Sequence, residues 1–308
     1  MILGGNGRFL ISSFGWIEHG AFILRDLSTN KVISFPDDGS RYLRLYAVDE
    51  DRFFVAGHAP TKDFVHFSLR SFSNPASVIW SLRVTPTTQV VTGSMEGGTR
   101  IPIYHLVNFC NRNRWDYLLV ELKPDGSGAT FGTLPWYNSA NFDISYQSLF
   151  DVTALPNASH VLVSMQRSST IVVHDPFTGH PREQFQLADR GGNPVLTVVG
   201  NELWTIDYDT FVAVDLSSRQ ATTKLLLQAG LNNGSQFAGK LFYWKPYHKA
   251  VIPRPFSGDV VILDEKHTAI ESGVKLGREP LECVVTREGR IVARDWKTGH
   301  WLEGNISK

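Results

Sequence analysis

One short element recurs along the whole chain and limits the folds open to it. The element is a polar turn followed by a half-apolar strand, and its copies read "GGNGRFLIS", "DEDRFFVAG", "PNASHVLVS", "VGNELWTID", "KPYHKAVIP" and "TREGRIVAR". Equivalent positions in the copies are Arg8, Arg52, His160, Glu202, Lys249 and Arg290. These anchors lie about 40 to 48 residues apart, except for one double-length interval between Arg52 and His160. The spacing predicts a repeat protein with a further copy in that interval.

The long interval contains a pattern that supplies the missing copy. "VVTGSMEGGTRIPIYHLVNF" is followed by "RWDYLLVELKPDGSGATFGTL", which reads as a longer hairpin with an enlarged loop. The count of repeats becomes seven.

Each repeat is expected to contain four short strands. The stretch 149–185 shows them best, as "FDVTAL", "HVLVSM", "TIVVHD" and "REQFQL", separated by tight turns. Helical periodicity is nearly absent from the chain, which predicts an all-β protein. The third strand tends to end on an aspartate, at Asp26, Asp175, Asp215 and Asp264. A short carboxylate can accept hydrogen bonds from backbone donors in a turn, so we interpret these four as structural.

A period of about 40 to 45 residues with four strands resembles the layout of the WD40 and YVTN-type β-propeller superfamily. The resemblance covers essentially the whole chain. However, the Gly-His and Trp-Asp pairs do not recur at one position of the repeat as the signatures of WD repeats do, "ARDW" reverses the second, and no specific family is indicated. It implies one β-propeller domain over residues 1–308, with seven blades of four antiparallel strands. The last blade has only three strands from the C-terminus. Residues 1–3 serve either as the first blade's inner strand or as the strand that closes the last blade.

Charge and composition limit the classes of partner that the protein is expected to bind. The 308 residues contain 30 Lys plus Arg and 30 Asp plus Glu, so no overall field attracts nucleic acid. No apolar run is long enough to span a membrane, and the N-terminus lacks a charged region typical of a signal peptide. The two cysteines, Cys110 and Cys283, are far apart in unlike contexts, which predicts free thiols in a cytoplasmic protein. We therefore expect neither nucleic acid nor a membrane as partner.

The connections between second and third strands carry most of the functional side chains. In a four-stranded blade these connections emerge on one face, around the channel mouth, and binding residues concentrate on such loops. The predicted ligand-binding residues are Glu18, His19, His58, Arg167, Asp207, Arg254, Asp295 and Trp296. Aromatic residues interleave with them at Trp16, Trp115 and Tyr208.

Two classes of function fit these residues. The first is recognition of a protein or peptide, because Trp, Tyr and Arg dominate binding hot spots, with a polar small molecule or a carbohydrate as related ligands. The second is a metal-assisted hydrolase or lyase that uses the carboxylates and histidines of the same mouth. No metal-ligand motif, no G-x-S-x-G elbow and no phosphate loop is present, and "GGNGRF" reads as a hairpin turn. We expect no cofactor, and favour recognition.

The longest connection between repeats is "GTLPWYNSANFDISYQ", residues 132–147, with Trp136, Tyr137 and Phe142 close together. Long connections with aromatic residues are often functional. This segment is either a lid or docking ridge at the mouth, or a loop folded over a blade edge.

Overall fold

Among the described residues, the regular secondary structure is β-strand, apart from two short 3₁₀ turns at Lys245–Tyr247 and Pro255–Ser257. The structure is a computed structural model. It describes residues 2–13, 22–34, 42–59, 64–84, 89–92, 100–109, 112–123, 128–135, 149–155, 159–165, 168–177, 180–187, 194–228, 231–232, 235–236, 238–295 and 297–306.

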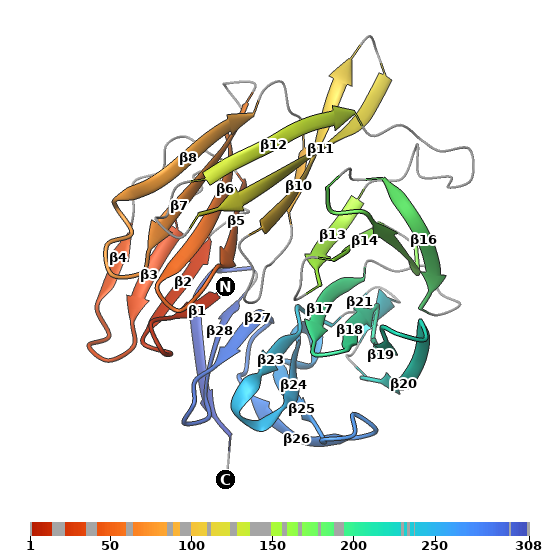
Figure 1. The fold of residues 1–308 in the computed structure, drawn as a ribbon. Coiled ribbons are helices and arrows are strands. Elements are labelled where there is room, and N and C mark those ends of the chain that lie inside the picture. Colours follow the sequence, from red (N-terminus) through yellow and green to blue (C-terminus); the bar gives the residue numbers. More distant parts are fainter. Residues whose placement is uncertain are drawn as a thin grey trace. The chain divides into compact units, whose positions relative to one another are not determined.

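Three four-stranded antiparallel sheets form the N-terminal half (Figure 1). The first sheet contains β1 (Ile2–Gly4), β2 (Phe9–Ser13), β3 (Phe22–Asp26) and β4 (Val32–Ser34). The second contains β5 (Tyr42–Ala47), β6 (Arg52–Ala59), β7 (Phe64–Ser71) and β8 (Val78–Val84). The third contains β9 (Gln89–Thr92), β10 (Arg100–Phe109), β11 (Arg112–Leu122) and β12 (Gly128–Pro135). The third sheet is the copy predicted within the double-length interval, with the long inner hairpin.

Four further sheets follow in chain order. The fourth contains β13 (Leu149–Ala154), β14 (Val161–Met165), β15 (Thr170–His174) and β16 (Pro181–Gln186). The fifth contains β17 (Val195–Val199), β18 (Glu202–Asp207), β19 (Thr210–Asp215) and β20 (Gln220–Leu226). The sixth contains β23 (Phe242–Trp244), β24 (Lys249–Arg254), β25 (Asp259–Leu263) and β26 (Ile270–Lys275). The seventh contains β27 (Pro280–Val285), β28 (Arg290–Asp295) and β29 (Trp301–Asn305). A small hairpin, β21 (Leu231–Asn232) with β22 (Ser235–Gln236), stands between the fifth and sixth sheets in the chain.

The predicted register is confirmed. Each anchor residue stands at, or one residue before, the start of a second strand, as Arg52 does in β6 and Arg290 in β28. The four strands expected within 149–185 agree with β13 to β16 to within one or two residues.

Pairing at the N-terminus decides between the two roles left open for residues 1–3. Ile2 lies opposite Ile11 and Leu3 opposite Leu10, so β1 is the inner strand of the first sheet. The seventh sheet has three strands in the described part of the chain, in the order β27-β28-β29, as predicted.

The chain divides into two compact units, which we describe separately. The first comprises residues 1–147, 151–163 and 172–183, and the second comprises residues 148–150, 164–171 and 184–308. The first three sheets belong to the first unit, and the last three belong to the second.

Within each unit, central strands are buried on both faces, because they pack against sheets on either side. In the first unit, Phe53 and Val55 of β6 join a core cluster with Ile11 and Leu24 of the first sheet. The residue between them, Phe54, points the other way and joins a cluster with residues of the third sheet. The strand period of two therefore sends alternate side chains into two cores.

The second unit repeats this arrangement. Ala250 and Ile252 of β24 pack with Trp204 of the fifth sheet, whereas Val251 packs with Cys283 and Ile291 of the seventh. Because both faces need apolar residues, the central strands read as nearly continuous apolar runs, such as "DVVIL" in β25.

The four aspartates that follow or end third strands hold turns, as predicted. The Oδ1 atom of Asp215 accepts hydrogen bonds from the backbone N–H groups of Ser217 and Ser218, at 3.0 and 2.7 Å. These bonds, chiefly the one from Ser218, lower the pKa of Asp215. Asp26, Asp175 and Asp264 accept equivalent bonds from residues two to five positions later.

Cys283 is a free thiol, 4% exposed, in the core of the second unit, and burial raises its pKa. The free-thiol prediction is confirmed for this residue, whereas Cys110 lies outside the described residues. Neither 3₁₀ turn has the length or hydropathy of a membrane span, and the described residues contain no other helix.

Candidate functional site

Three predicted site residues occupy one equivalent position in successive sheets. Asp207 ends β18, Arg254 ends β24 and Asp295 ends β28, so each is the last residue of a second strand. His58 is the penultimate residue of β6, again a second strand, but its side chain is not described. Sequence reasoning therefore placed these residues correctly in the repeat.

The other predicted site residues lie outside the described residues: Glu18, His19, Arg167 and Trp296. So does residue range 136–148, which contains the aromatic part of the long connection. Their part in a site stays a prediction.

Asp207 is almost completely buried, with 3% of its surface exposed. Its Oδ2 atom accepts a hydrogen bond of 2.6 Å from the hydroxyl of Ser169, which stands in the connection between β14 and β15 of the fourth sheet. The Asp207 side chain thus ties the fifth sheet to the connection of the preceding one. Such a buried carboxylate supports the backbone around it rather than offering a free surface group.

Arg254 has the same kind of role in the sixth sheet. Its guanidinium donates to both carboxylate oxygens of Asp259, with Nε–Oδ1 at 2.8 Å and Nη2–Oδ2 at 2.7 Å. Its Nη1 donates to the carbonyl oxygens of Leu227 and Gln228, at 2.8 and 3.3 Å, directly after β20. The Arg254 and Asp259 side chains are only 15% and 8% exposed. This pair joins the second and third strands of the sixth sheet to the end of the fifth.

Asp295 closes the turn after β28 and is 4% exposed. Its Oδ1 accepts bonds from the backbone N–H groups of Lys297 and Thr298, and its Oδ2 accepts one of 3.3 Å from the N–H of Glu279. Burial alone would raise the pKa of Asp295, but the hydrogen bonds outweigh burial and lower it.

A repeated backbone bond reinforces the same end of three sheets. The residue after each fourth strand donates its N–H to a carbonyl in the connection between second and third strands: Leu187 to Ser169, Leu227 to Asp209 and Leu276 to Gly258, at 2.7 to 2.9 Å. The connections of the fourth, fifth and sixth sheets are therefore held by backbone and side-chain bonds together. A rigid frame of this kind can present a side chain without much loss of entropy on binding.

Tyr208 is the side chain that this frame presents. It lies in the turn between β18 and β19 and is 45% exposed, whereas the carboxylates on either side, Asp207 and Asp209, are 3% and 2% exposed. Its backbone carbonyl accepts a bond of 3.1 Å from the N–H of Ala238. Leu226, the last residue of β20, pairs with Thr210, the first residue of β19, and is 52% exposed.

The backbone of Tyr208 is left-handed, with φ of 58°. This conformation costs a non-glycine residue about 1–2 kcal/mol, and more readily suits Asn or Gly. Strained residues persist where the surroundings fix them, and they gather at functional sites. The sequence shows the aromatic residue between two aspartates, but not its strain or its exposure.

Among the described residues, no three His, Cys, Asp or Glu side chains come together in a group that could hold a metal ion. The carboxylates of Asp207 and Asp295, both named for the metal-assisted alternative, are used in the hydrogen bonds above.

Comparisons with known proteins show the fold. No protein-family model matches the sequence, and the search of curated proteins finds no match. Among solved structures, the Cps50 (Swd1) β-propeller domain of Myceliophteria thermophila is similar with a TM-score of 0.67 and 13% identity, covering 99% of this chain and 96% of that one. BamB from Moraxella catarrhalis has a TM-score of 0.54 and 10% identity, covering 96% of each chain.

A third similar structure is a Bacteroides fragilis protein provisionally assigned as a 6-phosphogluconolactonase. Its TM-score is 0.59 at 14% identity, covering 97% of this chain and 95% of that one. At such identities a likeness establishes fold alone. The protein is an all-β chain with the β-propeller fold, and its seven sheets are the blades predicted from the repeat.

Proposed function

We propose that this propeller is an interaction module that binds a protein or peptide partner through its second-to-third-strand connections, with Tyr208 as an anchor. The observation that carries the proposal is the exposed, left-handed Tyr208 on a turn fixed by buried bonds on both sides. Tyrosine is one of the residue types that supply most binding energy at interfaces, because it buries a large ring and keeps a polar tip.

Chemistry around Tyr208 suits a partner with an apolar side chain and donor groups. Leu226 adds an apolar surface beside the turn, and two buried carboxylates flank it. Asp209 has an Oδ2 with no hydrogen-bond partner among the described residues. A negative field from Asp207 and Asp209 favours donors in the partner near the tyrosine.

Quantitative affinity capture from the native source tests this proposal. The bait proteins are wild type, Tyr208→Asn and Tyr247→Ala. Asparagine tolerates the left-handed backbone, so the first change removes the ring and keeps the turn. Tyr247 is a matched control, because it is also 45% exposed but stands in the 3₁₀ turn between β23 and β24, a first-to-second-strand connection.

We expect wild type and Tyr247→Ala to capture a partner protein that Tyr208→Asn does not capture. Binding of the purified partner should then weaken by about 2 kcal/mol or more in Tyr208→Asn. Equal capture by all three baits contradicts the assignment of the face. A small molecule retained by wild type and lost with Tyr208→Asn would instead indicate the ligand-binding form of the module.

A further inference from the structure

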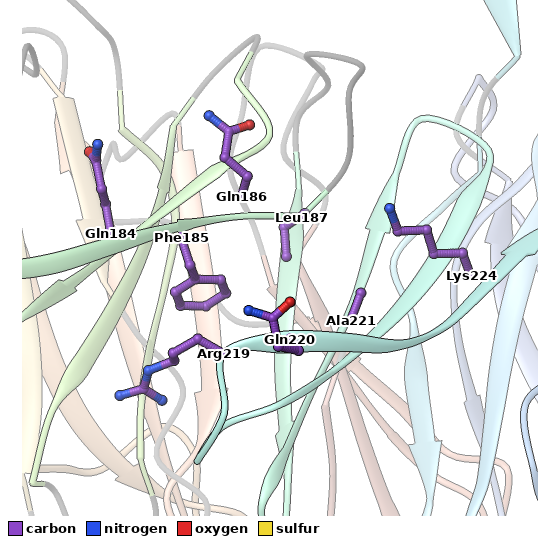
Figure 2. A pocket seen from close by; sticks show the side chains of 8 residues that line it. All are labelled: Gln184, Phe185, Gln186, Leu187, Arg219, Gln220, Ala221 and Lys224. Atoms are coloured by element: carbon purple, nitrogen blue, oxygen red, sulfur yellow. The ribbon is translucent and has the colours of Figure 1, made fainter.

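A groove of about 590 Å³ opens between the outer strands of the fourth and fifth sheets. Its walls come from the end of β16 and from β20. In Figure 2, Gln184, Gln186 and Lys224 stand up from the two strands, while Phe185 and Arg219 point below them. The volume lies within the range of ordinary ligand sites.

Both strands beside the groove are sheet edges. β16 is the last strand in the order β13-β14-β15-β16, and β20 is the last in the order β17-β18-β19-β20. An edge strand presents backbone N–H and C=O groups on its outer side, and an extended peptide can pair with them. Groove and edges together have the shape that an added strand requires.

The side chains of the groove favour negative charge. Two of the eight lining residues are cationic, three are glutamines that can donate from their amides, and none is a carboxylate. The Arg219 guanidinium lies 5.8 Å from the centre of the Phe185 ring, and its Nη1 donates to the carbonyl of Leu216. These contacts hold its charge in place at the base of the groove.

Lys224 differs from three other lysines of the second unit, which are held in ion pairs. Lys249, Lys275 and Lys297 pair with Glu271, Asp259 and Glu279 respectively. No ion pair of Lys224 is found within the described residues, and its side chain is exposed. Its charge is thus available to a ligand.

We propose that this groove binds an extended acidic peptide segment, which pairs with a strand edge and directs its carboxylates to Lys224 and Arg219. The inference goes beyond the proposed function, since it concerns a second surface. Nucleic acid fits less well, because binding to phosphates needs many cations whereas the groove has two. The outer sides of the edge strands also present hydrogen-bonding groups that match those of a peptide backbone.

The test uses two fluorescein-labelled peptides of about eight residues, the length of a strand. One alternates Glu with Thr and Val, and its twin has Lys in place of Glu. Fluorescence anisotropy at low salt measures the binding of both to the whole protein. We expect the Glu peptide to bind about 10-fold more tightly than its twin, and Lys224→Glu to reverse that preference. Hydrogen exchange should slow at the amides of residues 220–226 when the Glu peptide binds.

Lys245→Glu is the matched control, because Lys245 is an exposed lysine of the same unit in the 3₁₀ turn before β24. Both Lys245→Glu and Tyr208→Asn should leave the preference for the Glu peptide over its Lys twin unchanged. Equal binding of both peptides by wild type overturns the proposal, and so does an equal effect of Lys245→Glu and Lys224→Glu. A labelled single-stranded DNA that binds more tightly than the Glu peptide, and loses affinity in Lys224→Glu, would assign the groove to nucleic acid instead.

Discussion

The imidazole of His267 lies edge-on against the indole of Trp204, with ring centroids 4.3 Å apart and planes at 68°. His267 stands in the turn between β25 and β26, and Trp204 lies in β18, so this contact joins the fifth and sixth sheets. Phe211 and His248 also lie within 6.5 Å of the imidazole, centre to centre. His267 is 5% exposed, and its Nε2 has no hydrogen-bond partner among the described residues.

Acidification should weaken the stability that this contact between the fifth and sixth sheets provides. Burial lowers the pKa of His267; the nearby His248 lowers it further, whereas Glu202 and Asp264 oppose the shift. Because the folded pKa is below the unfolded value of about 6.5, the unfolded chain binds the proton first. The stability from neutral His267 is therefore complete above pH 6.5 or so, and it falls as the pH drops towards the folded pKa, by at most about 1.4 kcal/mol per pH unit.

Urea unfolding at pH 7.5, 6.5 and 5.5, followed by tryptophan fluorescence, measures this effect against His267→Gln. Glutamine keeps a neutral polar side chain, so the gap in unfolding free energy between the two proteins should narrow as the pH falls. The carboxylates with lowered pKa titrate well below this window, so they do not contribute to the change. A gap that stays constant from pH 7.5 to 5.5 contradicts the prediction.

A close backbone approach between the sixth and seventh sheets predicts a steric effect at Gly239. A Cβ atom there would lie 2.1 Å from the carbonyl oxygen of Leu281 and 2.8 Å from Cγ of Pro253. The N–H of Gly239 donates to Pro253, and that of Lys240 donates to Leu281, so neither neighbour can move freely. We expect Gly239→Ala to destabilise the protein by about 1–3 kcal/mol in urea unfolding.

Gly273 supplies the control for that substitution. It lies in β26, and the nearest atom to a Cβ there would be 3.8 Å away, which is an ordinary contact. Gly273→Ala should leave stability unchanged, or raise it by up to about 1 kcal/mol, because alanine restricts the unfolded chain. Similar losses for both variants would mean that the close approach at Gly239 is absent in solution.

Much of the fold could be predicted because residues close together in the sequence mark each repeat. The turn before six of the second strands and the aspartate at the end of four of the third strands are short-range signals, and together they indicated the register of the repeat. The aspartates form the hydrogen bonds that their side-chain length permits, as Asp264 does with Thr268 and Ala269. Such signals need no knowledge of how sheets pack.

The burial and the backbone strain of the site residues could not be predicted from the same signals. Position in the repeat was correct for Asp207, Arg254 and Asp295, but their burial depends on neighbouring sheets that contribute Ser169 and the carbonyl of Leu227. The strain at Tyr208 likewise comes from tertiary bonds on either side of the turn. Contacts between segments distant in sequence leave no mark in a local pattern.

The last prediction follows from the burial of Arg254. If Arg254 were an exposed residue at the rim of the channel mouth, Arg254→Ala would lower the free energy of unfolding by no more than about 1 kcal/mol. In the structure, Arg254→Ala removes both donors from Asp259, whose side chain is 8% exposed, and also removes the donor to the carbonyls of Leu227 and Gln228.

A buried carboxylate that loses its partner costs about 3–5 kcal/mol, although Lys275, 3.6 Å from Asp259, would recover part of that loss. We therefore expect Arg254→Ala to cost about 3 kcal/mol in urea unfolding. Arg290→Ala is the comparison, because Arg290 also makes two hydrogen bonds to one carboxylate, that of Glu303, but the two side chains are 30% and 37% exposed. An exposed pair contributes at most about 1 kcal/mol, so the cost there should be small. If the two arginine variants lose equal stability, burial does not distinguish the pairs, and Arg254 returns to the set of residues free to contact a ligand.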